Sequence, residues 1–332
     1  MPTLPPFRYL SAADVRAALP PLPEQLALAE RTMVALVRDA ELPPKIAVHP
    51  RPPGSFAHAM PAFLRGPAED GRDDRLGMKW VLGFATNNAL GLPAIHALVL
   101  LNDPSTGVPV AVLDGGPITA ARTAAISGLA IGRFAPPVSG RAPRVALIGA
   151  GVQGRAHLPV IGFVLPGAEL ALYDRHPERA EVLAEIARST AGIGPVRVAG
   201  SAREAIGDAD VVVTCASFTT PERRQVMTED WLVPDALVVP VDYATYCSAQ
   251  VARGAALFLV DERNQFLAGR ADHFAGYPDP HATLGEAILA GTPRPPGRVV
   301  VTHLGVGLAD VVFGDAIVRR AADLGLGLEL PR

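Results

Sequence analysis

The sequence predicts an α/β protein with a doubly wound parallel sheet, accompanied by a second, discontinuous α+β domain. The chain has 332 residues, more than one hydrophobic core usually organises, so two domains are expected. Beyond Arg144, short apolar runs alternate with helical segments, which is typical of a parallel sheet. Before residue 115 the apolar runs follow one another with turn residues between them, which favours strands and hairpins.

The first part of the chain predicts helices, then a sheet, then a helix. Ser11 can cap a helix that begins AADVRAAL, and apolar residues at helical spacing predict a second helix from Glu24 to Arg38. Residues 44 to 114 contain strand-like runs such as KWVLGF and AIHALVLLND, and EDGRDDR, residues 69 to 75, fits a solvated hairpin tip. The alanine-rich run ITAARTAAISGLAIGRF, residues 118 to 134, predicts a helix that leads into the next domain.

The second part repeats strand and helix units. Pro159 lies inside the expected first helix of this part, where we expect a kink. The final helix, GLADVVFGDAIVRRAADLG, need not belong to the parallel sheet, because a chain can leave one domain and return to it. We therefore expect an α+β domain of residues 1–122 plus 307–332 and a nucleotide-type domain of residues 123–306. The expected strands are RVALIG, ELALYD, VRVA, VVVTCAS, ALVVPVD, AALFLVD and RVVVTHL.

Composition excludes several classes of protein. The net charge of -3 comes from interspersed acids and bases, and without a basic stripe nucleic acid is not an expected ligand. Cys215 and Cys247 fit neither a disulfide framework nor a metal-binding pair. No apolar run approaches the length of a membrane span and no signal peptide is evident, so we expect a cytoplasmic protein that contacts no membrane.

A glycine loop is the strongest local motif. Gly149, Gly151 and Gly154 follow an apolar strand and open a helix, so backbone amides can meet a pyrophosphate, as in a Rossmann-type dinucleotide site. Asp174 closes the next strand, where a carboxylate can bind the adenosine ribose; this favours NAD, although Arg175 leaves NADP possible. The expected cofactor-binding residues are Gly149, Gly151, Val152, Gln153, Gly154, Asp174, Arg175, Thr214, Ala216 and Ser217.

Taken with segments on both sides of the loop, the chain resembles the ornithine cyclodeaminase and mu-crystallin family. The resemblance rests on YLSAADV, PPKIAVHP, MKWVLGFATNN, ITAARTAAISGLA, GAGVQG, VVPVDYATY and LGVGLAD. It implies an NAD(P)-dependent oxidoreductase that exchanges hydride between nicotinamide and the α carbon of a small amino or imino acid. It also implies a homodimer.

The resemblance also assigns roles to individual residues. The cations that hold the substrate carboxylate fall on Lys45, Lys79 and Arg122, and charged donors suit that task. The substrate-facing aspartate falls on Asp242, and Lys79 or Asp242 would handle protons at the nitrogen. His303 stands where the family commonly has serine and could add a donor near the nicotinamide, and it is expected at the substrate site together with Leu304.

Plainer interpretations and departures from the family pattern remain open. Lys79 could lie at a strand edge, Asp242 could cap a turn, and Asp310 could only complement the dipole of its helix. Lys45 stands where the cyclodeaminases have arginine, and Ala94 and Tyr246 also depart from their pattern. Two other functions therefore stay possible: a cyclodeaminase that uses bound NAD and releases ammonia, and a binding protein without catalysis. Other histidines, including His96, His273 and His281, fit structural roles, and no metal site is expected.

Overall fold

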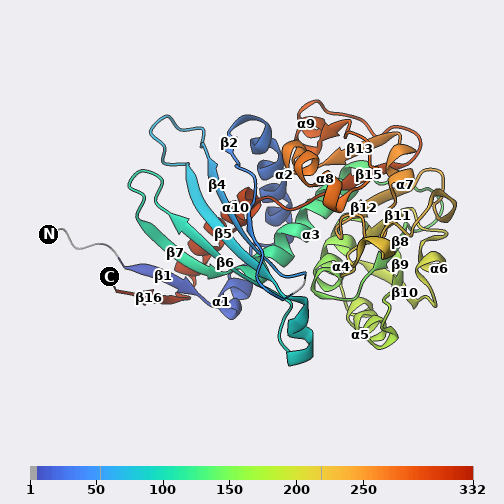
Figure 1. Ribbon diagram of the computed structural model, residues 1–332, viewed down its shortest axis with the longest axis horizontal. Coiled ribbons are helices and arrows are strands. Elements are labelled where there is room, and N and C mark those ends of the chain that lie inside the picture. Colours follow the sequence, from blue (N-terminus) through green and yellow to red (C-terminus); the bar gives the residue numbers. More distant parts are fainter. Residues whose placement is uncertain (1–5, 53, 218, 332) are drawn as a thin grey trace. The chain divides into compact units, whose positions relative to one another are not determined.

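The computed structural model describes residues 6–52, 54–217 and 219–331, and its chain divides into two compact units (Figure 1). Unit 1 comprises the chain up to Arg122 and from Gly305 onward, and unit 2 comprises Thr123 to Leu304. The return to unit 1 therefore falls at Gly305, where the sequence suggested residue 307. Helix α3 (Gly115–Phe134) contains the first boundary and matches the alanine-rich run.

Unit 1 is built on an eight-stranded mixed sheet. Four long strands form an antiparallel meander, as the turn residues between the apolar runs predict. At one edge β1 pairs in parallel with β7 and antiparallel with β16, which joins the two ends of the chain in one sheet. The strands are β1 (Phe7–Leu10), β2 (Ala40–Glu41), β3 (Ile46–Val48), β4 (Phe56–Leu64), β5 (Arg75–Gly83), β6 (Ile95–Asn102), β7 (Pro109–Asp114) and β16 (Leu328–Leu330).

Helices pack on one face of this sheet. The helices α1 (Ala12–Ala17), α2 (Leu22–Arg38) and α10 (Gly307–Asp323) lie close to the predicted spans, and Ser11 caps α1 in a capping box. Helix α10 is buried over most of its length, which requires close approach to the strands. A β carbon at Gly307 would lie 2.4 Å from the carbonyl oxygen of Met60, so this contact with β4 requires glycine. A short 3-10 helix, η1 (Ala85–Leu90), joins β5 to β6.

Unit 2 contains an eight-stranded, wholly parallel sheet, which confirms the predicted doubly wound fold. The chain starts in the sheet at β8, adds β9 and β10 on one side, and then continues with β11 and β12 on the other. The strand order therefore reverses between β8 and β11, and ligands of such sheets bind at the carboxyl ends of the strands beside that point. The strands are β8 (Arg144–Ile148), β9 (Ala168–Tyr173), β10 (Ile193–Val198), β11 (Val211–Thr214), β12 (Leu237–Pro240), β13 (Leu257–Val260), β14 (Ala282–Thr283) and β15 (Val299–Thr302).

Short helices connect these strands. Helix α4 (Val152–Val164) continues through Pro159, whose ring faces outward. The proline leaves the carbonyl of Arg155 without its helical partner, and Arg155 is exposed, so water can satisfy that group. The remaining helices are α5 (Pro177–Arg188), α6 (Ala202–Ile206), α7 (Ala249–Arg253), α8 (Arg263–His273) and α9 (Leu284–Leu289), with the 3-10 helices η2 (Pro221–Arg223) and η3 (Glu229–Trp231).

Candidate active site

The glycine loop lies between β8 and α4, at the carboxyl edge of the parallel sheet. Gly149 has a φ of +107°, and a β carbon there would lie 2.6 Å from the carbonyl oxygen of Cys215. A β carbon at Gly154 would lie 2.1 Å from the carbonyl oxygen of Gly149, so this glycine permits the helix to pack against the loop. The first and third glycines are therefore required by the fold itself.

Gly151 differs from the other two glycines because a β carbon there would meet no atom within 4 Å. It is the N-cap residue of α4, which begins without a side-chain cap at Val152, and the Val152 side chain is 72% exposed. The first turn of the helix therefore has amides without a side-chain cap beside the open space at Gly151, and such a helix start favours the binding of a pyrophosphate. These residues fit an NAD molecule, whose pyrophosphate Gly151, Val152 and Gln153 would hold.

Asp174 follows β9 and accepts a hydrogen bond from the glycine loop. One carboxylate oxygen accepts a hydrogen bond from the backbone N–H of Ala150 at 2.7 Å, and the other accepts one from His176 at 2.9 Å. Each oxygen keeps a second lone pair for a ribose hydroxyl. Asp174 thus has a structural role in the loop in addition to the expected one, and Arg175 beside it is exposed.

Asp242 is buried just beyond the end of β12. The Thr214 hydroxyl donates to one oxygen at 2.8 Å, and the Ala216 N–H donates to the other at 3.2 Å. Burial raises the pKa of Asp242 to about 7, and these hydrogen bonds oppose that rise because they favour the carboxylate. Thr214 and Ala216 were expected to bind the cofactor, but their polar groups contact Asp242. Ser217, from the same expectation, is exposed.

In unit 1, Lys79 on β5 and Arg122 on α3 share one buried counter-ion, Asp310 of α10. The Lys79 Nζ lies 2.6 Å from Asp310 Oδ2, and the Arg122 Nε lies 3.2 Å from Asp310 Oδ1. All three side chains are buried, with Asp310 fully enclosed. Two cations therefore face one anion in a region that water does not reach.

Burial lowers the pKa of Lys79 to about 7, and it outweighs the opposing attraction of Asp310. Arg122 and Lys45 add to the lowering, so Lys45 lies close enough to act on this cluster. The structure thus brings two of the three predicted carboxylate ligands, Lys79 and Arg122, onto one counter-ion, and the charge of Lys45 acts on Lys79. That counter-ion is Asp310, weighed from the sequence as a helix-start residue.

The conformation and surroundings of Gly305 explain why this position of LGVGLAD is a glycine. Its φ is +82°, and a β carbon there would lie 2.7 Å from the Nη1 atom of Arg122. Any other residue would displace the guanidinium group. The backbone at Gly305 therefore sets the position of Arg122.

The remaining predicted residues lie at the end of β15. His303 is buried, Leu304 is half-buried, and the hydroxyl of Tyr243 donates to the Leu304 carbonyl oxygen at 3.1 Å. Tyr243 has a φ of +58°, a conformation that an aromatic residue rarely adopts, and it directly follows Asp242. This turn therefore ties the ends of β12 and β15 together on the carboxyl edge of the sheet.

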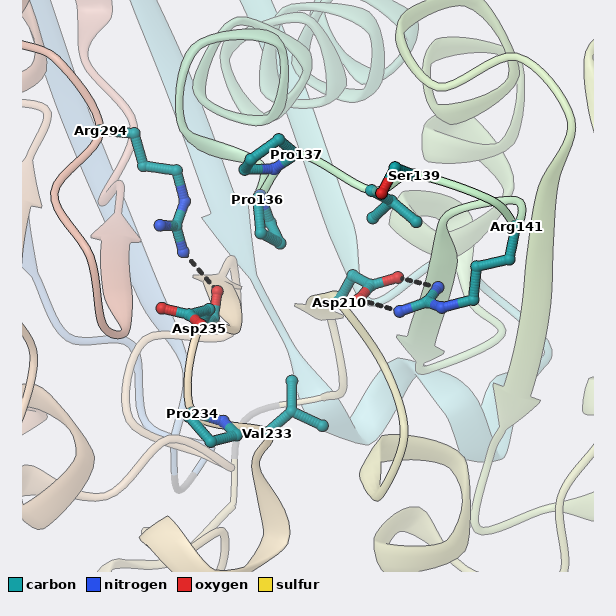
Figure 2. Close-up of a pocket in the computed structure, with 10 residues that line it drawn as sticks. Pro136, Pro137, Ser139, Arg141, Asp210, Val233, Pro234, Asp235 and Arg294 are labelled. Carbon is teal, nitrogen blue, oxygen red and sulfur yellow. Dashed lines mark hydrogen bonds and ion pairs between the residues drawn. The ribbon is translucent and has the colours of Figure 1, made fainter.

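A cavity of about 460 Å³ lies at the opposite, amino edge of the same sheet (Figure 2). Its arginines already have partners: Arg141 binds both oxygens of Asp210 at 2.6 and 2.7 Å, and Arg294 binds the carbonyl oxygen of Asp235. The donors of both arginines are therefore engaged within the protein. The cavity is separate from the loop that fits NAD.

The described residues contain no group of three or more His, Cys, Asp or Glu side chains that could hold a metal ion. His281 accepts a hydrogen bond from the Phe258 N–H at 2.9 Å and so serves the fold. Within the described ranges, no helix has the length and apolarity needed to cross a membrane.

A parallel sheet that reverses its strand order beside a glycine loop of this geometry defines a dinucleotide-binding protein of the Rossmann class. The chain belongs to the ornithine cyclodeaminase/mu-crystallin family, whose model matches residues 12–303. The resemblance stated from the sequence is thereby confirmed.

Individual relatives cover most of the chain. Nodulation efficiency protein NfeD of Rhizobium meliloti is 35% identical over 97% of this chain and 98% of its own length. Ketimine reductase mu-crystallin of Mus musculus is 32% identical over 74% of this chain and 76% of its own. The structure of Thermococcus litoralis Δ(1)-pyrroline-2-carboxylate reductase with NADH and L-proline superposes with a TM-score of 0.83 at 25% identity, covering 98% of this chain and all of that one.

Proposed function

We propose that this protein is an NAD(H)-dependent oxidoreductase that transfers hydride between nicotinamide and the α carbon of a small amino or imino acid. The buried cluster of Lys79, Arg122 and Asp310 carries this proposal. Among the described residues, Lys79 and Arg122 share the one carboxylate of Asp310, and when Lys79 is protonated an α-carboxylate of the substrate would balance the remaining positive charge. When bound, NAD(H) supplies or accepts the hydride at nicotinamide C4.

Arg122 is the main ligand for the substrate carboxylate in this proposal. Asp310 takes one of the five donors of its guanidinium group, and the planar geometry of that group suits two parallel bonds to a carboxylate. In this proposal, Lys79 and Lys45 add positive charge that attracts the same carboxylate. The ketimine reductase and pyrroline-carboxylate reductase relatives are named for imino-acid substrates, which supports the same substrate class.

Lys79 or Asp242 would supply the proton chemistry in this proposal. The pKa of each lies near 7, which is far below the ordinary value for a lysine and far above that for an aspartate. Groups that titrate near the working pH make the most effective general acids and bases. In the reductive direction, the protonated form of whichever of the two serves as the acid would donate its proton toward the substrate nitrogen.

The test is a substrate screen that follows NADH absorbance and ammonia in parallel. Amino acids are offered with NAD and cyclic imino acids with NADH. We expect one NADH to be consumed or formed per substrate converted. Ammonia release without a net change in NADH would instead assign a cyclodeaminase, and binding without turnover of any substrate would assign a binding protein.

A variant pair tests the carboxylate ligand in the same assay. Arg122→Met should lower kcat/KM at least about thirtyfold, since removing one side of a buried charged contact costs about 2 kcal/mol or more. The dissociation constant of NADH should not change. Arg38→Met provides the control, because Arg38 is exposed on α2 and should tolerate the same substitution. Equal kinetics in both variants would overturn the role of Arg122.

We also propose a homodimer formed through the open face of the unit 1 sheet. The register places Ile46, Ala59, Trp80 and Leu98 in one row across β3, β4, β5 and β6, on the face opposite Lys79. Ile46 is 63% exposed and Leu98 46% exposed, and exposed apolar side chains that gather in one row favour an interface. Light scattering should give twice the chain mass, and Leu98→Lys should give a monomer; a monomeric wild-type protein would refute the dimer.

A further inference from the structure

Three buried polar side chains of unit 2 form an unbroken hydrogen-bonded chain. Ser127 lies on α3, His157 on α4, and His303 directly after β15. The Ser127 Oγ lies 2.8 Å from His157 Nε2 and 2.9 Å from His303 Nε2, while His157 Nδ1 lies 2.7 Å from the carbonyl oxygen of Gln153. Gln153 lies in the first turn of α4, directly after the glycine loop, so this chain connects the start of α4 to the end of β15.

The direction of each hydrogen bond follows from its fixed end. A backbone carbonyl can only accept, so His157 Nδ1 carries a proton and donates it to Gln153. Burial lowers the pKa of His157 to about 4, so the ring is neutral at pH 7 and its Nε2 accepts. The hydroxyl proton of Ser127 must therefore point to His157.

The serine oxygen is then left as an acceptor toward the second histidine. His303 Nε2, which lies 2.9 Å from it, has to donate and so carries the ring proton. In a neutral imidazole the other nitrogen, Nδ1, then bears the lone pair. The sequence suggested His303 as a donor; in the neutral ring the Nε2 proton is donated to Ser127, and Nδ1 is the acceptor.

We infer that Ser127 and His157 are positioning residues that hold His303 in its Nε2–H tautomer, so that His303 accepts an N–H group of a bound ligand. This inference rests on the proposed function. His303 lies at the carboxyl edge of the parallel sheet, where ligands of this fold bind. An acceptor there binds an N–H donor and disfavours a carboxylate, which separates its role from that of the cations of unit 1.

Two ligand groups share this chemistry: the carboxamide of the nicotinamide and the nitrogen of the amino or imino acid. Both present N–H donors. In the first case His303 accepts a hydrogen bond from the cofactor, and in the second it accepts one from the substrate. Adding NADH and a non-reacting amino acid separately to the protein distinguishes them.

The test is ¹⁵N NMR of the full chain labelled at histidine, with the His303 signals assigned from a His303→Gln variant. We expect the Nε2–H tautomer for His303 and the Nδ1–H tautomer for His157. In Ser127→Ala the His303 signals should become those of a tautomer mixture, while Thr32→Val, which removes another buried helical hydroxyl, should leave them unchanged. An Nδ1–H tautomer for His303 in the wild-type protein would overturn the inference.

Ligand titrations then test the acceptor role. A shift of the His303 Nδ1 signal on adding NADH identifies the carboxamide as donor, and a shift only with the amino acid identifies the substrate nitrogen. If NADH binds by fluorescence and neither ligand moves the signal, the acceptor role is wrong while the proposed function stands. If NADH does not bind at all, the proposed function fails, but the tautomer assignment is still tested. Ser127→Ala should also lower kcat/KM roughly tenfold, the effect of one lost hydrogen bond.

Discussion

Substitution of Asp310 by asparagine should destabilise unit 1 because Asp310 is the shared counter-ion of two buried cations. It lies 2.6 Å from Lys79 Nζ and 3.2 Å from Arg122 Nε, and it is fully buried. Removing one partner of a buried ion pair typically costs about 3 to 5 kcal/mol, since an uncompensated charge is left behind. The amide keeps the size of the side chain, so packing is preserved.

The loss of unfolding free energy in Asp310→Asn should depend on pH, because Lys79 can lose its proton. Its pKa is about 7 in the folded protein and 10.5 in the unfolded chain, so between these values the unfolded chain binds the extra proton. Stability of the wild-type protein therefore rises with pH across this window, by up to about 1.4 kcal/mol per pH unit. Asp310 raises the pKa of Lys79, so in Asp310→Asn that pKa falls below 7 and the window extends to lower pH.

Urea denaturation of both proteins at pH 6 and pH 9 measures this effect. We expect the loss of unfolding free energy to be about 3 to 5 kcal/mol at pH 6 and smaller at pH 9, where Lys79 is neutral in both proteins. Asp315→Asn is the matched control. Asp315 lies on the same helix and pairs with Arg75 at 2.6 Å, but its side chain is 28% exposed, and Arg75 keeps its hydrogen bonds to the carbonyl oxygens of Arg72 and Asp74. The substitution should therefore cost about 1 kcal/mol at either pH. A loss at pH 6 no larger than that of Asp315→Asn would refute the shared counter-ion.

Two pairs of glycine substitutions test the loop and the carboxylate ligand. Gly151→Ala should weaken NADH binding about tenfold without changing stability, because its β carbon faces open space. Gly154→Ala should instead lower the unfolding free energy by about 1 to 3 kcal/mol. Unchanged NADH affinity in Gly151→Ala would contradict the pyrophosphate site. Gly305→Ala should raise KM for the amino acid, because the added β carbon meets Arg122. Gly325 has a similar positive φ, but open space surrounds it, so Gly325→Ala should leave KM unchanged. Steady-state kinetics decide between these outcomes, and equal KM values for the two variants would show that Gly305 does not position Arg122.

Local patterns were sufficient to predict the parallel sheet and the glycine loop. Each strand there is a short apolar run, and Gly149, Gly151 and Gly154 lie within six residues between a strand and a helix. Their required conformations depend on near neighbours. The helix of residues 118 to 134 was predicted for the same reason, since its alanine content acts locally.

The role of Asp310 could not be predicted from local patterns, because its partners lie far away in the sequence. Arg122 is 188 residues from it, and Lys79 is further still. One signal was present: Asp310 lies within the run GLADVVFG, where it is surrounded by apolar residues and glycine, and an aspartate there needs a buried partner. The partner itself emerges only when α10 packs on the unit 1 sheet.

The chain of Ser127, His157 and His303 was missed for a related reason. Ser127 and His157 occupy ordinary helical positions, and nothing in the local sequence links them to a residue after β15. Their hydrogen bonds span 30 and 176 residues. Tertiary packing alone brings the three side chains together.

Deuterium transfer from NADH labelled at both C4 positions tests hydride transfer to the α carbon directly. Purified protein is incubated with the labelled NADH and a cyclic imino acid that the screen identifies, and the amino-acid product is examined by mass spectrometry and NMR. We expect one deuterium on the α carbon of the product, with one NADH consumed per product. A product without deuterium at that carbon, formed while NADH remains constant, would contradict the proposed function.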